Sequence, residues 1–123
     1  KILVVEDDPK MLRMYERAFR LAGHEVEVAG DGEDGLGKIK KSFPGLIFLD
    51  IMMPKLNGME VLAKLKADPK TVGIPVVMMT NLISGTLPMA KEAVVKKWAR
   101  RYIVKSDMVP EQIVRVAEEV LHG

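Results

Sequence analysis

Five short apolar runs, separated by longer amphipathic segments, constrain the fold of this chain more than any other feature. The runs cover residues 2–5, 26–28, 46–49, 76–79 and 102–104. The run at 46–49 is continuously apolar, which is typical of a central strand covered on both faces of a parallel sheet. The run at 26–28 alternates with glutamates, which predicts a half-exposed strand at an edge of the sheet.

The segments between the runs carry helix signals. Asp8 precedes Pro9, which is typical of a helix cap followed by proline in the first turn. Helices are expected over residues 9–22, 33–41, 59–66 and 89–100, and from Pro110 onward with Ile113, Val116, Ala117, Val120 and Leu121 on the buried side. Trp98, in the fourth of these helices, either packs in the core, which is the favoured interpretation, or lies exposed as an interaction anchor.

This alternation of strands and helices predicts a single α/β domain over residues 1–123. Because crossovers between parallel strands are right-handed, the five units form a (βα)5 doubly wound parallel sheet. With the second strand at an edge, the expected strand order is the flavodoxin-like one, 2-1-3-4-5. A chain of this length, with 48% hydrophobic residues, builds its core without disulfides.

Composition also bears on location and partners. No apolar run approaches the ~20 residues that span a bilayer, so no membrane association is expected. The net charge of +2 is too small to indicate direct nucleic-acid binding by this domain. The chain has no cysteine, which fits a reducing compartment, and a cytoplasmic location is expected.

Four of the five apolar runs end on side chains that phosphoryl-transfer chemistry uses. These are Glu6, Asp7 and Asp8 after the first run, Asp50 after the third, Thr80 after the fourth and Lys105 after the fifth. The carboxyl ends of parallel strands share one edge of the sheet, where ligands bind in α/β folds. Strands need no such endings for stability, so the pattern predicts a functional site at that edge.

The carboxylates at this edge predict a metal site. Glu6, Asp7 and Asp50 would bring like charges together, and a divalent cation offsets their repulsion. Oxygen ligands completed by water suit Mg²⁺, with Mn²⁺ as a second candidate. The alternative is that Glu6 and Asp8 are solvated, and for Asp8 a purely capping role is favoured.

Asp50 is the candidate nucleophile, because it follows a buried strand and precedes an irregular loop. Carboxylates form aspartyl-phosphates, and their formation depends mainly on positioning and on neutralising the phosphoryl oxygens. A metal on one side and Lys105 on the other would supply that neutralisation. Thr80 is expected to donate a hydrogen bond to a phosphoryl oxygen.

The chain resembles the receiver domain of bacterial response regulators, proteins of two-component systems. The resemblance rests on Val4-Val5-Glu6-Asp7-Asp8-Pro9, on the stretch from Leu49-Asp50 through Met52-Met53-Pro54 to Asn57-Gly58, on Met79-Thr80-Asn81, and on Tyr102-Ile103-Val104-Lys105. It covers essentially the whole chain. It implies that Asp50 accepts a phosphoryl group from a phosphohistidine of a sensor histidine kinase or a phosphotransfer protein.

The same resemblance implies a role for each site residue. Asp7, Asp50 and the backbone carbonyl of Met52 would bind Mg²⁺ directly, and Glu6 would act through water. Lys105 would bind the phosphoryl group, and Thr80 would form a switch pair with Tyr102. The implied function is a phosphorylation-activated switch rather than an enzyme, since the domain catalyses only its own phosphorylation and a slow dephosphorylation. Hydrolysis of the phospho-aspartate is expected to be slow, because the two positions that flank the site in the family are occupied here by the apolar residues Met52 and Leu82.

The output surface implied by the resemblance consists of the fourth helix, the fifth strand and the last helix. It would control an unidentified output domain or protein partner, and two copies would be able to pair through it. The basic cluster of Lys96, Lys97, Arg100 and Arg101 on it is either a solvated helix end, favoured by the helix dipole, or a surface for an acidic partner. Where the family has a cis proline after the lysine, this chain has Ser106.

Two other classes of protein place similar residues after strands. Haloacid-dehalogenase-like phosphatases also use an aspartate at a strand end, but they need a second aspartate two residues later, where this chain has Met52. A flavodoxin-like cofactor module would cradle phosphate in its first loop, but Glu6, Asp7 and Asp8 would repel an anion there. Both alternatives are disfavoured.

Overall fold

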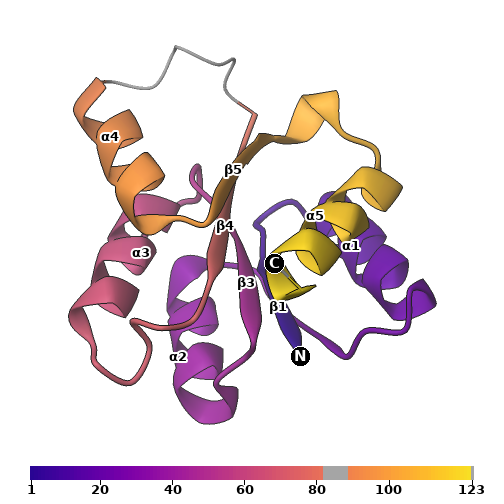
Figure 1. Ribbon diagram of the computed structural model, residues 1–123, viewed down its shortest axis with the longest axis horizontal. Coiled ribbons are helices and arrows are strands. Elements are labelled where there is room, and N and C mark those ends of the chain that lie inside the picture. Colours follow the sequence, from indigo (N-terminus) through magenta and orange to yellow (C-terminus); the bar gives the residue numbers. More distant parts are fainter. Residues whose placement is uncertain (82–88, 123) are drawn as a thin grey trace.

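The computed structural model describes residues 1–81 and 89–122 and has a five-stranded parallel sheet (Figure 1). The strand order is β2-β1-β3-β4-β5, so the flavodoxin-like order predicted from the sequence is confirmed. The elements are β1 (Ile2–Val5), α1 (Pro9–Leu21), β2 (Val26–Ala29), α2 (Gly32–Ser42), β3 (Leu46–Asp50), α3 (Gly58–Ala67), β4 (Val76–Thr80), α4 (Met89–Trp98), β5 (Arg101–Val104), the 3-10 helix η1 (Lys105–Asp107) and α5 (Pro110–His122).

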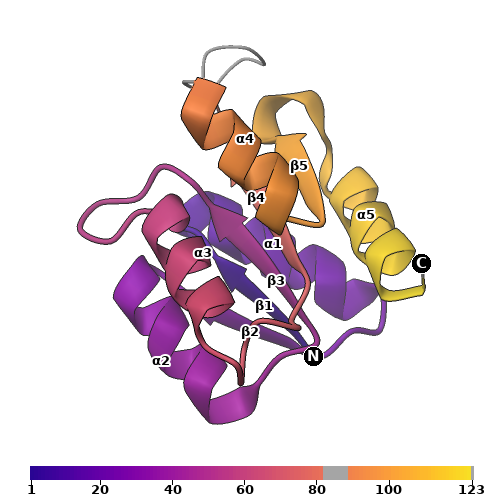
Figure 2. The same cartoon turned by 60° about the vertical axis from the view of Figure 1, so that its left-hand side comes forward.

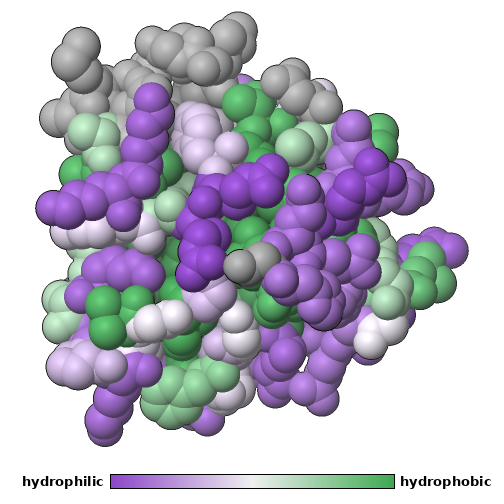
Figure 3. All heavy atoms as spheres, viewed as in Figure 1, coloured by the Kyte–Doolittle hydropathy of each residue, from purple (hydrophilic) through white to green (hydrophobic). Residues whose placement is uncertain are grey.

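Helices cover both faces of the sheet, and the sheet separates the core into two layers (Figure 2). Ile2 and Val4 point toward α1 and α5, whereas Leu3 and Val5 point toward the layer beneath α2, α3 and α4. This alternation is the two-residue period of a strand, and burial on both faces explains why the central runs are continuously apolar. Hydrophilic side chains cover much of the surface seen in Figure 3, which has the viewpoint of Figure 1.

The carboxyl-terminal half of the fold corrects three predictions. Trp98 is 37% exposed rather than buried. Val95, which is 2% exposed, fills the core position that was expected for Trp98. α4 ends at Trp98 rather than near residue 100, because the Arg100 amide donates to the carbonyl of Val76 and thereby joins the chain to β4. Leu121 is 41% exposed, since the helical period places Val120 on the buried stripe and turns its neighbour outward.

The peptide after Lys105 does not reproduce the cis geometry of the family. No cis peptide bond occurs within the described ranges, and the chain continues from Lys105 into η1. Within the same ranges, no helix combines the length and apolarity needed to cross a membrane.

Gly58 fixes the loop that follows Asp50, and we expect its replacement by alanine to destabilise the protein by about 2–3 kcal/mol. The Gly58 amide donates to the Ile51 carbonyl at 3.0 Å, and an added Cβ would lie 2.8 Å from the Cα of Ile51 and even closer to the Asp50 carbonyl oxygen. These atoms are backbone and cannot yield cheaply. Urea denaturation measures the loss of stability.

Gly37→Ala is the matched control for this prediction. Gly37 is an exposed residue inside α2, and an added Cβ there meets nothing within 4 Å. The control variant is expected to gain about 0.5–1 kcal/mol from helix propensity. Equal stability changes in the two variants would contradict the steric argument.

Candidate functional site

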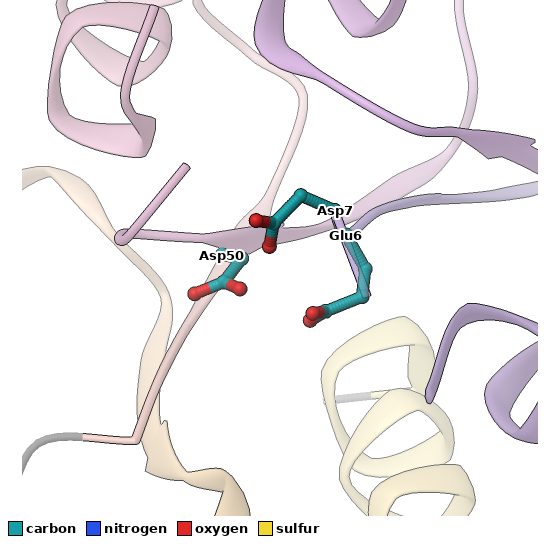
Figure 4. Close-up of side chains that lie close together, drawn as sticks. All are labelled: Glu6, Asp7 and Asp50. Carbon is teal, nitrogen blue, oxygen red and sulfur yellow. The ribbon is translucent and has the colours of Figure 1, made fainter. Parts of the chain in front are cut away.

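The carboxyl edge of the sheet brings acidic side chains from β1 and β3 together. Val5 pairs with Leu49 in the parallel register, so the next residues, Glu6 and Asp50, are neighbours across the two strands. Glu6, Asp7 and Asp50 each offer a carboxylate oxygen, and these oxygens all lie within 4.8 Å of one another (Figure 4). In Figure 4 the three carboxylates converge on one space beyond the strand ends.

Lys105 reaches into this cluster from the end of β5. Its Nζ donates to Glu6 Oε2 and to Asp50 Oδ2, each at 2.8 Å. All three residues are buried, with exposed fractions of 1% for Glu6, 2% for Asp50 and 4% for Lys105. The alternative that Glu6 is a solvated surface acid is therefore wrong.

The pKa of the Glu6 carboxyl and the pKa of the Lys105 ammonium are both raised in this cluster. Burial raises the pKa of the Glu6 carboxyl from 4.5 to about 7; the hydrogen bond from Lys105 opposes this rise, and the charge of Asp50 adds to it. Burial alone would lower the pKa of the Lys105 ammonium, but its hydrogen bonds to Asp50 and Glu6 outweigh burial and raise the pKa above 10.5. Lys105 therefore stays charged near neutral pH, where Glu6 is partly protonated.

Backbone amides hold the remaining carboxylate oxygens. Asp50 Oδ1 accepts from the Met52 amide and Glu6 Oε1 accepts from the Asp8 amide, both at 3.2 Å. The Asp8 side chain instead accepts from the Lys10 amide at 2.9 Å as the N-cap of α1. The capping role predicted for Asp8 is confirmed.

The donor set of this cluster fits a hard divalent cation. The ligand atoms offered are all carboxylate oxygens, which Mg²⁺ prefers, and Asp7 is exposed, so the site is open to solvent. When all groups are ionised, three carboxylates and one ammonium leave a charge of about −2, which a divalent cation neutralises. Lys105 lies on the buried side of the cluster and leaves the Asp7 side accessible.

Thr80 and Tyr102 lie on the two strands beside the acidic cluster. Thr80 is fully buried at the end of β4, where its Cα pairs with Val104, and Tyr102 pairs with Met78 and packs against the layer beneath α2, α3 and α4. The two residues are therefore on adjacent strands, two register positions apart. Met52 is exposed at 58%, whereas Leu82 lies outside the described residues.

Tyr15 of α1 is a member of this environment that the sequence did not single out. It is fully buried, and burial raises the pKa of its phenol to about 12; the charge of Lys105 acts against the rise, and those of Glu6, Asp50 and Asp8 act with it. Its position in the apolar stripe of a helix gave no signal beyond core packing. Tyr15 is thus a neutral phenol within electrostatic range of the acidic cluster.

A family model and the sequences of known proteins indicate the same family for this chain. The family model of the response regulator receiver domain matches residues 2–117. The gliding motility regulatory protein of Myxococcus xanthus is 32% identical over 121 residues, which are 98% of this chain and 15% of that protein. The DNA-binding response regulator MtrA of Mycolicibacterium smegmatis is 40% identical over 80 residues, 65% of this chain and 34% of that protein.

Solved structures agree in fold and length. The chemotaxis protein CheY4 of Vibrio cholerae has a TM-score of 0.85 and 28% identity, and the match covers 98% of this chain and 97% of that one. A CheY-like receiver domain protein from Methanospirillum hungatei has a TM-score of 0.85 and 30% identity, with 98% and 92% covered. Among curated relatives, by contrast, the chain spans about a third of the length of the regulators it matches. The chain belongs to the receiver domains of two-component response regulators.

Proposed function

We propose that this domain is a phosphorylation-activated switch in which Asp50 accepts a phosphoryl group from a sensor histidine kinase or a phosphotransfer protein. The observation that carries the proposal is the buried arrangement around Asp50, whose carboxylate is held by the Lys105 ammonium on one side and the Met52 amide on another. A nucleophile fixed in this way is already oriented, and phosphoryl transfer depends mainly on orientation and charge neutralisation.

Each residue of the cluster has a distinct part in this chemistry. Asp50 attacks the phosphorus through one carboxylate oxygen, and the leaving group departs from the opposite side. Lys105, already hydrogen-bonded to Asp50, remains to bind the negative phosphoryl oxygens. Thr80, at the end of the neighbouring strand, donates to another of these oxygens.

Asp7, Asp50 and the carbonyl of Met52 would hold Mg²⁺, or Mn²⁺, with Glu6 acting through water. Bound there, the cation would neutralise charge on the acidic cluster and on the incoming phosphoryl group. The support for this ligand set is the convergence of the three carboxylates and the open, exposed side of Asp7. Asp8, occupied in capping α1, is not part of it.

The phosphorylated state would act on a partner through α4, β5 and α5. Thr80 moves toward the phosphoryl group, Tyr102 turns inward, and this pre-existing equilibrium is shifted toward the active surface. That surface controls an output domain or a protein partner in the cytoplasm and offers a site for pairing of two copies. The domain catalyses its own phosphorylation and a slow dephosphorylation and acts on no other substrate.

We expect acetyl phosphate with Mg²⁺ to add one phosphoryl group to the protein, measured by intact mass, and Asp50→Asn to abolish it. The reason is that the amide cannot attack phosphorus as a carboxylate does. Asp8→Asn is the matched control, because Asp8 adjoins Asp7 of the acidic cluster in the sequence but serves as a helix cap. Labelling of Asp50→Asn equal to that of the parent would contradict the proposal.

We expect beryllofluoride, a phosphoryl mimic, to shift the amide resonances of β5 and of residues 93–98 in the Mg²⁺-loaded protein. The shift follows from coupling between Thr80 and Tyr102. The control is Asp50→Asn, whose spectrum should not change. Identical parent spectra with and without beryllofluoride would exclude the switch.

A further inference from the structure

A second surface lies at the amino-terminal end of β4, the end opposite to Thr80. α3 and α4 lie side by side above it (Figure 2), and two adjacent hollows open between them and the start of β4. One hollow, of about 420 Å³, is lined by Lys66, Lys97, Trp98 and Arg100 among others. The second, of about 280 Å³, is lined by Ala63, Lys66, Ala67, Val72 and Trp98. We call the two together the Trp98 surface.

The larger hollow concentrates positive charge without neutralising it. Lys66 Nζ donates to the carbonyls of Val72 and Ile74 at 3.0 and 3.2 Å, which anchors the ammonium at the rim. Burial lowers the pKa of Lys66, and the charge of Arg100 lowers it further, so the two cations repel each other. In the part of the chain that the structure describes, Lys66, Lys97 and Arg100 form no ion pair with a carboxylate.

This charge distribution separates the Trp98 surface from the rest of the basic cluster. Arg101, the next residue along the chain, turns to the α5 side, where its guanidinium lies 3.7 Å from Glu119. Lys66, which lies on α3, lines the same hollow as Lys97 and Arg100 at the end of α4. Cations from two elements therefore face one hollow, which a solvated helix end alone does not explain.

Four of the five residues that line the smaller hollow are apolar. Trp98 is 37% exposed and Val72 is 47% exposed, and Ala63 and Ala67 of α3 complete the apolar lining. Trp98, Val72 and Lys66 line both hollows, so the apolar and the cationic compartments share one wall. An indole at the boundary of a charged and an apolar site is the kind of anchor that protein interfaces use.

We propose that the Trp98 surface binds an acidic peptide segment of a partner protein that presents an apolar side chain next to a carboxylate. The apolar side chain enters the hollow between Trp98 and Val72, and the carboxylate pairs with Lys97 and Arg100. Charge complementarity selects an anion, and the apolar compartment selects a peptide. Nucleic acid is less suitable, because the cations converge on one small hollow instead of following a line along which phosphates could lie.

The single tryptophan of the chain makes the proposal directly measurable. The probe is the acetylated peptide Asp-Leu-Asp-Glu-Leu-Asp, titrated at low salt while Trp98 fluorescence is recorded. Two matched peptides replace either the leucines by serine or the acidic residues by asparagine and glutamine. We expect a saturable change with the first peptide and affinity lower by about tenfold or more with each of the others. No fluorescence change up to millimolar probe overturns the proposal.

Charge-reversed variants locate the site. Lys97→Glu combined with Arg100→Glu should weaken binding of the probe by about tenfold or more. Lys40→Glu combined with Lys41→Glu makes the same change in net charge on exposed positions of α2 and should leave specific binding intact. Unfolding midpoints and labelling by acetyl phosphate, measured for both variants, check that the fold and the Asp50 site are unaffected.

Two further results would overturn the proposal, the second of them from a parallel titration with a short oligothymidylate. One is equal affinity of the probe for the Lys97/Arg100 variant and for the Lys40/Lys41 variant, which would indicate nonspecific attraction. The other is a short oligothymidylate that binds more tightly than the peptide and is lost in the Lys97/Arg100 variant, which would assign the surface to nucleic acid.

Discussion

Lys105→Ala is expected to lower the free energy of unfolding of the metal-free protein by about 3–5 kcal/mol at pH 8, because it leaves Glu6 and Asp50 buried without their shared cation. The loss should be smaller at pH 5.5, where Glu6 is protonated and only one buried charge remains. Urea denaturation in EDTA at the two pH values measures both quantities.

Lys40→Ala is the control for this prediction. Lys40 is exposed on α2, and its truncation should change stability by no more than about 0.5 kcal/mol at either pH. If Lys105→Ala behaves like Lys40→Ala at pH 8, the ion pairs of Lys105 contribute nothing to folding. In that case the Lys105 ammonium would position the two carboxylates without stabilising the fold.

Titration of Glu6 is expected to contribute a loss of about 3 kcal/mol of stability to the metal-free protein as pH rises from 4.5 to 8, and Glu6→Gln should remove this contribution. The pKa of Glu6 is about 7 in the folded protein and 4.5 ordinarily, so the folded state binds more protons between these values. Stability is therefore highest below pH 4.5 for this group and falls until pH passes 7. The ammonium of Lys105 does not titrate in this window, because its pKa is raised above 10.5.

The measurement is a series of urea denaturations in EDTA across this pH range for parent and variant. Because other groups also titrate, the informative quantity is the difference between the two proteins at each pH. Glu25→Gln, an exposed position before β2, should keep the slope of the parent. A parent slope that survives Glu6→Gln would place its origin in another residue.

The sequence predicted the sheet and the location of the site because both follow from strong local rules. Continuous or alternating apolar runs determine whether a strand is central or at an edge, and parallel strands necessarily bring their carboxyl ends to one edge. Asp50 and Lys105 were therefore placed together although they are 55 residues apart. The order of the strands, confirmed in the structure, rested on the polar alternation that placed the second strand at an edge of the sheet.

The features that the sequence did not predict depend on packing between elements. The sequence places Glu6 in the acidic cluster, but only the tertiary arrangement shows that Glu6 is buried and paired with Lys105. Trp98 looks like a core residue, yet Val95 is the buried residue of α4, and the helix ends at Trp98, which is partly exposed. In both cases the neighbour that decides burial belongs to the tertiary arrangement rather than to the local pattern.

The salt bridge from Lys105 to Glu6 joins residues 99 positions apart. It therefore determines when, during synthesis, the cluster of buried charges can be completed. During synthesis, β1 and β3 leave the ribosome well before β5. A nascent chain that ends before Lys105 carries Glu6 and Asp50 but lacks the ammonium that lies between them. The arrangement of Glu6, Lys105 and Asp50 is therefore complete only in chains whose last strand has docked, after nearly the whole domain has been translated.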